Sequence, residues 1–70
     1  MSPHELIFQV EEAPEGGFTA QALGESIYTQ AETYDALKDA VREAVACYFD
    51  EGQGPKMIRL HLVRDELLAI

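Results

Sequence analysis

Apolar residues recur at every second position in the first part of the chain. In residues 5–11, Leu6, Phe8 and Val10 fall on one side, and this period of two predicts a strand with one buried face. Residues 12–17 contain one proline and two glycines, which favour a reversal of the chain. The length of this turn indicates a loose hairpin rather than a tight two-residue turn.

Two further segments show the same alternation. Residues 18–22 form a predicted second strand, and we expect a helix to lie across its small inward residues Ala20 and Ala22. A turn centred on Gly24 follows. Residues 26–31 form a predicted third strand whose members on one face are Ile27, Thr29 and Ala31.

The apolar period changes to three or four residues after residue 33, which predicts an amphipathic helix. Thr33 is the predicted N-cap, Asp35 lies in the first turn, and Gly52 is the predicted stop after a helix that ends near Phe49. The apolar stripe contains Tyr34, Leu37, Val41, Ala44, Val45 and Tyr48, and the charged face contains Asp35, Lys38, Asp39, Arg42 and Glu43.

A fourth strand is predicted over residues 57–64, with Ile58, Leu60 and Leu62 on one face. Because a helix precedes it, this strand can cross over and join the sheet parallel to the first strand. The predicted fold is therefore a small α+β domain of β-β-β-α-β order, a partial ribonuclease H-like arrangement. Its sheet order is third, second, first and fourth strand, with the helix packed on one face.

The end of the chain is predicted to leave this strand. A single strand over residues 57–70 would be far longer than the usual ~5–6 residues, so we expect a break near Asp65 and Glu66. Residues 67–70 then form a short apolar strand or tail, which either folds back on the fourth strand or pairs with another subunit. The break contains no glycine or asparagine for a tight turn, which favours a bulge or an intermolecular pairing. The residues predicted for a subunit or partner interface are Arg59, His61, Arg64, Leu67, Leu68 and Ile70.

The length and the net charge of the chain limit the functions that it can have. We expect residues 1–70 to form a single domain, and a core of this size supplies only about 3–5 kcal/mol of stability. The lone cysteine, Cys47, excludes an intrachain disulfide, so a homo-oligomer is the expected support. Thirteen acidic residues against five basic ones give a net charge of −8, which disfavours direct nucleic-acid binding. The charge either attracts a basic partner or simply maintains solubility.

Candidate catalytic groups are few. His61 lacks an evident nucleophile or carboxylate partner, and His4 lies near the N-terminus. Cys47 lies near the C-terminal end of the predicted helix, where the helix dipole disfavours a thiolate, so we expect it to be a partly buried filler. Glu5, Glu11 and Glu12 only flank the first strand. No acidic residue falls in the interior of the first or fourth strand, whereas a two-metal nuclease of this fold holds its metals on acidic residues that include one on the first strand. We therefore expect no enzyme activity, no cofactor and no metal site.

Targeting signals are also lacking in the sequence. The first five residues show neither a basic segment nor an apolar one, so no signal peptide is predicted. No apolar run approaches the roughly 20 residues of a membrane span. We expect a cytoplasmic protein that does not contact a membrane.

Several short motifs together resemble the HicB-like antitoxin family. Gly17-Phe18-Thr19-Ala20 is similar to the family's Gly-aromatic-x-Ala strand, and Ala22-Leu23-Gly24 stands where a Leu-Pro-Gly turn is usual, without its proline. The next strand and the threonine-capped helix, Ile27 through Tyr48, correspond as well. The resemblance covers about residues 5–64.

This resemblance implies a ribonuclease H-like fold that has lost catalysis. It implies an oligomer that binds and neutralises a small basic ribonuclease toxin of the HicA type. The family's C-terminal DNA-binding region has no counterpart in this sequence, so transcriptional repression is not predicted. The alternative is a stand-alone homo-oligomeric interaction or regulatory protein with another partner.

Overall fold

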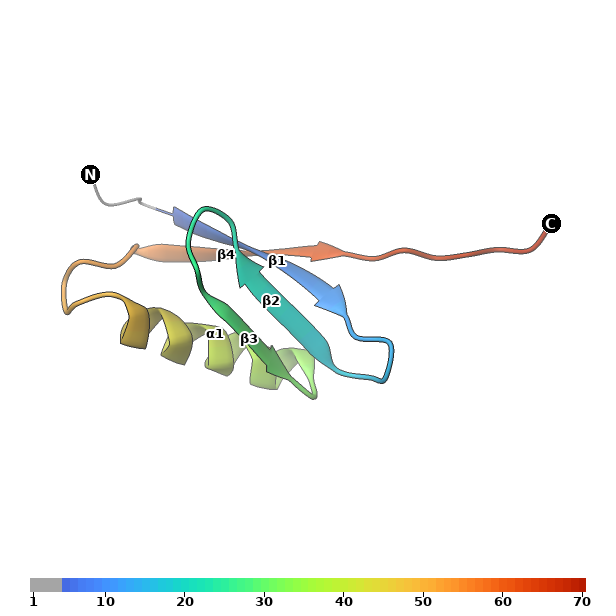
Figure 1. Ribbon diagram of the computed structural model, residues 1–70, viewed down its shortest axis with the longest axis horizontal. Helices are drawn as coiled ribbons and strands as arrows, with labels where there is room; N and C mark the ends of the chain where they lie inside the picture. The colour runs from blue at the N-terminus through green and yellow to red at the C-terminus, as the bar shows by residue number, and fades with distance from the viewer. Residues whose placement is uncertain (1–4) are drawn as a thin grey trace.

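The computed structural model describes residues 5–70 and confirms the predicted α+β fold (Figure 1). A four-stranded sheet has the order β3-β2-β1-β4, and one helix covers one of its faces. Strand β1 pairs antiparallel with β2 and parallel with β4, as the crossover through the helix predicts. In chain order the elements are β1 (Glu5–Glu12), β2 (Phe18–Ala22), β3 (Tyr28–Ala31), α1 (Tyr34–Tyr48) and β4 (Met57–Val63).

The core lies between the sheet and α1. Helix α1 contacts β3 and β2, and the small Ala20 and Ala22 of β2 are buried beneath it. The expectation that a helix crosses these alanines is confirmed. The centre is filled by fully buried Phe8 of β1 together with Leu37 of α1. The whole buried cluster consists of Leu6, Phe8, Val10, Ala20, Ala22, Ile27, Leu37, Val41 and Val45.

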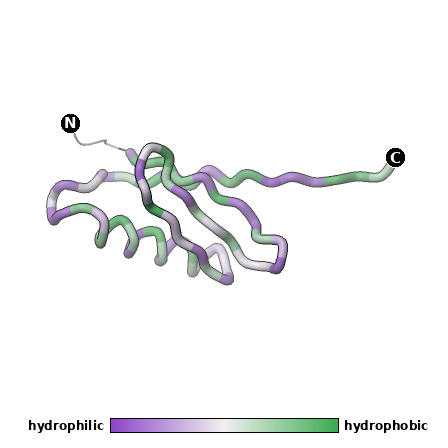
Figure 2. Tube along the Cα trace, viewed as in Figure 1, coloured by the Kyte–Doolittle hydropathy of each residue, from purple (hydrophilic) through white to green (hydrophobic). Residues whose placement is uncertain are grey.

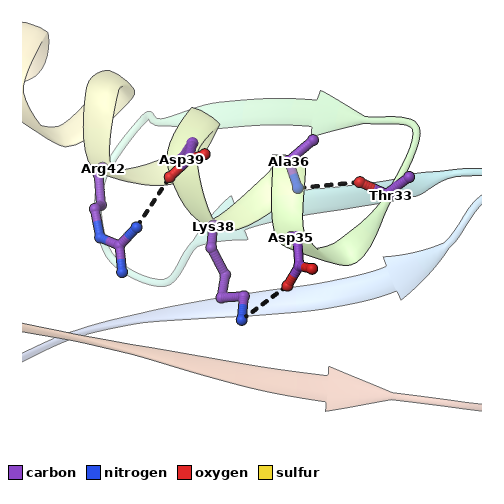
Figure 3. Close-up of polar contacts among 6 residues, drawn as sticks. All are labelled: Thr33, Asp35, Ala36, Lys38, Asp39 and Arg42. Carbon is purple, nitrogen blue, oxygen red and sulfur yellow. Dashed lines mark hydrogen bonds and ion pairs between the residues drawn. The ribbon is translucent and has the colours of Figure 1, made fainter.

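Local signals at the helix ends explain where α1 begins and ends. The hydroxyl of Thr33 accepts a hydrogen bond from the backbone N–H of Ala36 at 3.1 Å, so the predicted N-cap is confirmed (Figure 3). The helix ends at Tyr48, and Phe49 caps it in an extended conformation while its N–H donates to the carbonyl of Val45. Gly52 is therefore not the helix stop, because it lies in the following turn with φ +80°.

Three sequence expectations need correction. Strand β3 begins at Tyr28 rather than Ser26, although Ile27 is buried as its alternation predicts. Tyr48 was expected in the buried stripe but is 48% exposed, and its hydroxyl donates to Glu25 at 3.1 Å. Cys47 is exposed rather than a partly buried filler, because it lies off the stripe of α1 that contains the buried Leu37, Val41 and Val45.

The chain leaves the sheet after Val63. Residues 64–70 form neither helix nor strand and continue straight out of β4, away from the rest of the molecule (Figure 1). The molecule is therefore elongated, with extents of 51 × 21 × 18 Å. The predicted break before residue 67 is confirmed. The chain does not fold back on β4 in this structure.

Candidate protein-binding surface

A groove with four glutamates lies at the end of the sheet where β1 and β3 finish. We call it the acidic groove; its charged lining is Glu11, Glu12, Glu15 and Glu32. Aromatic and polar side chains from β2 and β3 line the rest, among them Phe18, Tyr28 and Gln30. Because β1 and β3 are both antiparallel to β2, their C-terminal ends lie at the same end of the sheet, and this brings the carboxylates together.

The turn between β1 and β2 forms one wall of the acidic groove. Gly16 and Gly17 both have positive φ, and the N–H of Ala13 donates to the carbonyl of Gly17 at 2.9 Å. Gly17 also lies so close to β3 that a Cβ there would be 2.8 Å from the carbonyl oxygen of Ala31. The two glycines that predict a turn in the sequence therefore both adopt positive φ, and Gly17 also allows the turn to approach β3.

The charge of the acidic groove is only partly compensated. Glu12 pairs with Arg64 at 2.6 Å, and Glu11 accepts a hydrogen bond from Gln9 at 3.1 Å. Within residues 5–70, neither Glu15 nor Glu32 forms an ion pair. Four carboxylates against one guanidinium leave a negative surface that attracts cationic side chains.

An exposed tyrosine adds apolar surface beside the glutamates. Tyr28 of β3 is 60% exposed, and its ring lines both the acidic groove and the neighbouring hollow over β1 and β2. Phe18 is held from behind by Tyr34 of α1, with ring centroids 5.7 Å apart in an edge-on arrangement. Tyrosine, an aromatic ring with a polar tip, is enriched at protein-binding surfaces.

A second groove lies between α1 and β4, and its lining is apolar and basic rather than acidic. Its bed is apolar, and three of the five basic residues of the chain stand at its rim. We call it the basic-rimmed groove; its lining is Lys38, Val41, Arg42, Pro55, Lys56, Met57, Ile58 and Leu60. Figure 3 shows that Lys38 and Arg42 pair with Asp35 and Asp39 of α1, at 3.1 and 3.0 Å. Such exposed pairs contribute little and exchange partners readily.

The predicted interface residues do not form one cluster. On the uncovered face of the sheet, Arg59 makes two contacts with Glu5, one of them from Nη2 at 3.0 Å. The hydrogen bond from Arg59 lowers the pKa of Glu5 below its ordinary value, and the reciprocal bond raises the pKa of Arg59. Arg64 pairs with Glu12 on the other side of the sheet. Both arginines therefore connect β4 to β1 within one chain.

The other predicted interface residues are exposed. His61 lies on the uncovered face of the sheet, opposite Gln9 in the register with β1. The side chains of Leu67 and Leu68 are 100% and 76% exposed, and Ile70 is fully exposed. Whether these residues contact another molecule stays a prediction.

Residues 5–70 contain no group of three or more histidine, cysteine, aspartate and glutamate side chains arranged to hold a metal ion. His4 lies outside the described residues. No helix within residues 5–70 is long and apolar enough to span a membrane.

The acidic groove was not predicted from the sequence, although the sequence contains a signal for it. Glu11, Glu12 and Glu15 follow the first strand, and Glu32 follows the third. Strands one and three of a meander run in the same direction, so residues that follow them lie at the same end of the sheet. The directions of the strands therefore predict, from the sequence alone, that these glutamates lie close together.

Comparison with known proteins identifies relatives of this chain. A UPF0150 protein from Archaeoglobus fulgidus is 52% identical over 52 residues, which cover 74% of this chain and 77% of the relative. A UPF0150 protein from Thermotoga maritima is 35% identical over 66 residues, covering 94% and 93%. Neither a family model nor a solved structure matches the chain. On the strength of these two relatives, the chain belongs to the UPF0150 family.

Proposed function

We propose that this protein is a non-catalytic binding module of the HicB type, which binds and neutralises a small basic ribonuclease toxin of the HicA type. The observation that carries the proposal is the acidic groove. Its carboxylates, an exposed tyrosine and a net charge of −8 suit a partner with a basic RNA-binding surface. A toxin whose basic surface is covered in this way cannot reach RNA phosphates.

The resemblance of residues 5–64 to HicB-like antitoxins supports the same proposal. The Gly-aromatic-x-Ala motif supplies Phe18 and Thr19 to the lining of the acidic groove. Its glycine, Gly17, lies against Ala31, which also lines the groove. The motif and the groove therefore belong to one structural unit.

The test is co-expression with a small basic HicA-type protein encoded by the same genome, followed by purification and a growth-rescue assay. We expect a complex of fixed stoichiometry and relief of toxicity. Absence of both complex and rescue would refute the proposal. A stand-alone homo-oligomeric regulatory protein would then become the better explanation, and the exposed apolar end of the chain is the observation that favours it.

The contact surface is tested by a matched pair of double variants. Glu15→Gln with Glu32→Gln removes two charges of the acidic groove that form no ion pair within residues 5–70. Glu43→Gln with Glu51→Gln removes the same number of charges from exposed positions outside it. We expect the first pair to weaken toxin binding about tenfold or more at low salt, mainly through the association rate, and the second to have little effect. Equal losses from both pairs would show that the net charge matters and the acidic groove does not.

A further inference from the structure

The apolar side chains of the C-terminal segment are not buried within one chain. Residues 64–70 extend from β4 in a straight line, and Figure 2 shows that the end of this segment is hydrophobic. The radius of gyration is 13.5 Å, whereas a compact chain of this length has a value of about 11 Å. Exposed apolar side chains on an extended segment indicate a contact that a single chain does not complete.

Strand β4 has an unpaired edge beside this segment. In the sheet order β3-β2-β1-β4 it is bonded to β1 alone, so its other edge offers backbone donors and acceptors. Proteins usually protect such an edge with lysine or proline inside the strand, but Met57–Val63 contains neither. Its one arginine, Arg59, is bound to Glu5 of β1 and does not block the edge.

The basic-rimmed groove lies along the same strand. It has a volume of about 420 Å³, and its apolar bed includes Val41, Ile58 and Leu60. The two β4 residues are only partly buried, since α1 packs mainly on β3 and β2. A strand that pairs with the free edge of β4 would place its apolar side chains over this bed.

The segment cannot easily reach the groove of its own chain. It leaves from the C-terminal end of β4, while the groove begins at Pro55 before the strand. Folding back would need a tight turn within Arg64-Asp65-Glu66, which offers no glycine or asparagine for positive φ. A second copy of the chain, running in the opposite direction, meets no such obstacle.

We propose that two copies pair antiparallel through the free edges of β4, and that residues 64–70 of each copy form a strand along β4 of the other. The lengths match, since β4 and the segment after it contain seven residues each. A two-fold axis at Val63 therefore pairs residues 64–70 of each copy with residues 56–62 of the other, which include all of β4 except Val63. The result is a continuous sheet across both copies, with both helices on the same face.

Side-chain chemistry agrees with this register. When Val63 of one copy faces Val63 of the other, Leu68 lies opposite Ile58, at the bed of the basic-rimmed groove. Glu66 then lies opposite Leu60, on the face of the sheet where Lys38 also lines the groove, so an acidic residue comes to the same groove as a basic one. Asp65 lies opposite His61 on the uncovered face. The register thus gives Leu68 an apolar neighbour and Asp65 a polar one.

The first test uses the purified full chain alone, so its outcome is independent of the toxin proposal. Sedimentation and light scattering over a range of concentrations should show a dimer. Leu68→Asp should weaken the dimer at least tenfold, because it places a charge on the apolar bed, and it leaves the core untouched. The matched control is Leu23→Asp, which changes a 54% exposed leucine in the β2–β3 turn and should leave the dimer intact. A monomer at all concentrations, or equal losses from both variants, would overturn the proposal.

The second test fixes the register. In a Cys47→Ser background, Val63→Cys should form a disulfide between two copies under mild oxidation, because antiparallel neighbours on a two-fold axis lie within bonding range. The control, Thr19→Cys, lies on β2 and should give no cross-linked dimer. A segment folded back on its own β4, or the same edge occupied only by a toxin, would leave Val63→Cys without a cross-link in the purified protein. Either result would overturn the proposal.

Discussion

Strands β1 and β4 are neighbours with the same alternation of apolar residues, yet they differ in how completely they are covered. In the parallel register Phe8 lies beside Leu60, and Val10 lies beside Leu62. Phe8 and Val10 are fully buried, whereas Leu60 is only partly buried and Leu62 is 42% exposed.

The position of α1 accounts for this difference. The helix packs mainly over β3 and β2. Its side chains also bury Phe8 and Val10 of β1, but they leave much of β4 open. We call β1, β2 and β3 with α1 the covered half, and β4 with residues 64–70 the uncovered half. The comparison teaches that alternation alone predicts a strand and its two faces but does not predict burial. Burial needs a second surface that reaches the strand.

The largest expected effect breaks the covered half at its centre. Phe8→Ala removes a fully buried ring and should cost about 3–5 kcal/mol, which equals the whole stability expected for a domain of this size. Circular dichroism should show this variant largely unfolded without denaturant. The milder Phe8→Leu should remain folded and lose about 1.5 kcal/mol in urea unfolding.

The matched change in the uncovered half is Leu62→Ala. In an isolated chain it should alter the free energy of unfolding by no more than about 0.5 kcal/mol, because the side chain is already partly in water. A loss that grows with protein concentration would instead show that β4 is covered in solution. Equal costs for Phe8→Ala and Leu62→Ala in dilute protein would contradict the distinction between the two halves.

An intermediate effect is expected at the wall of the acidic groove, in the covered half. Gly17→Ala should destabilise the fold by about 2 kcal/mol or more, because its positive φ disfavours a side chain and the new Cβ would meet the carbonyl of Ala31. Gly16→Ala shares the positive φ but has open space around it, so it should cost about 1 kcal/mol. Urea unfolding of the two variants separates backbone conformation from the contact with β3. Identical losses would show that the contact contributes nothing.

The smallest expected effect concerns the ion pair that links the two halves. Because the folded pKa of Glu5 is lowered, the pair with Arg59 stabilises the fold above the ordinary carboxyl value of 4.5. That contribution is lost as the pH falls through the lower folded pKa. Glu5→Gln should therefore be slightly less stable than the unaltered protein at neutral pH, and the difference should vanish in acid.

The control for this prediction is the reciprocal variant Arg59→Gln. It should remove the same part of the pH dependence, and the double variant should lose no more than either single variant. Urea unfolding between pH 2 and pH 7 measures all three. A stability difference between Glu5→Gln and the unaltered protein that persists in acid would rule out this ion pair as its cause.

The amino-acid sequence alone determined the elements and their order. Alternation identified all four strands, the threonine before the helix identified its N-cap, and the helical crossover identified the parallel pairing of β1 with β4. These features depend on local periodicity, on capping chemistry and on the connection between neighbouring elements. Each can therefore be deduced from residues close together in the chain.

Only the tertiary structure decided which apolar residues are covered and which charges meet. The exposure of Tyr48 and Leu62 depends on how α1 lies over the sheet, and no local pattern encodes that position. The pair between Glu5 and Arg59 joins residues 54 positions apart in the sequence, and it depends on the register of β1 with β4. Burial and long-range pairing are properties of two surfaces together, so they are settled only when the elements pack.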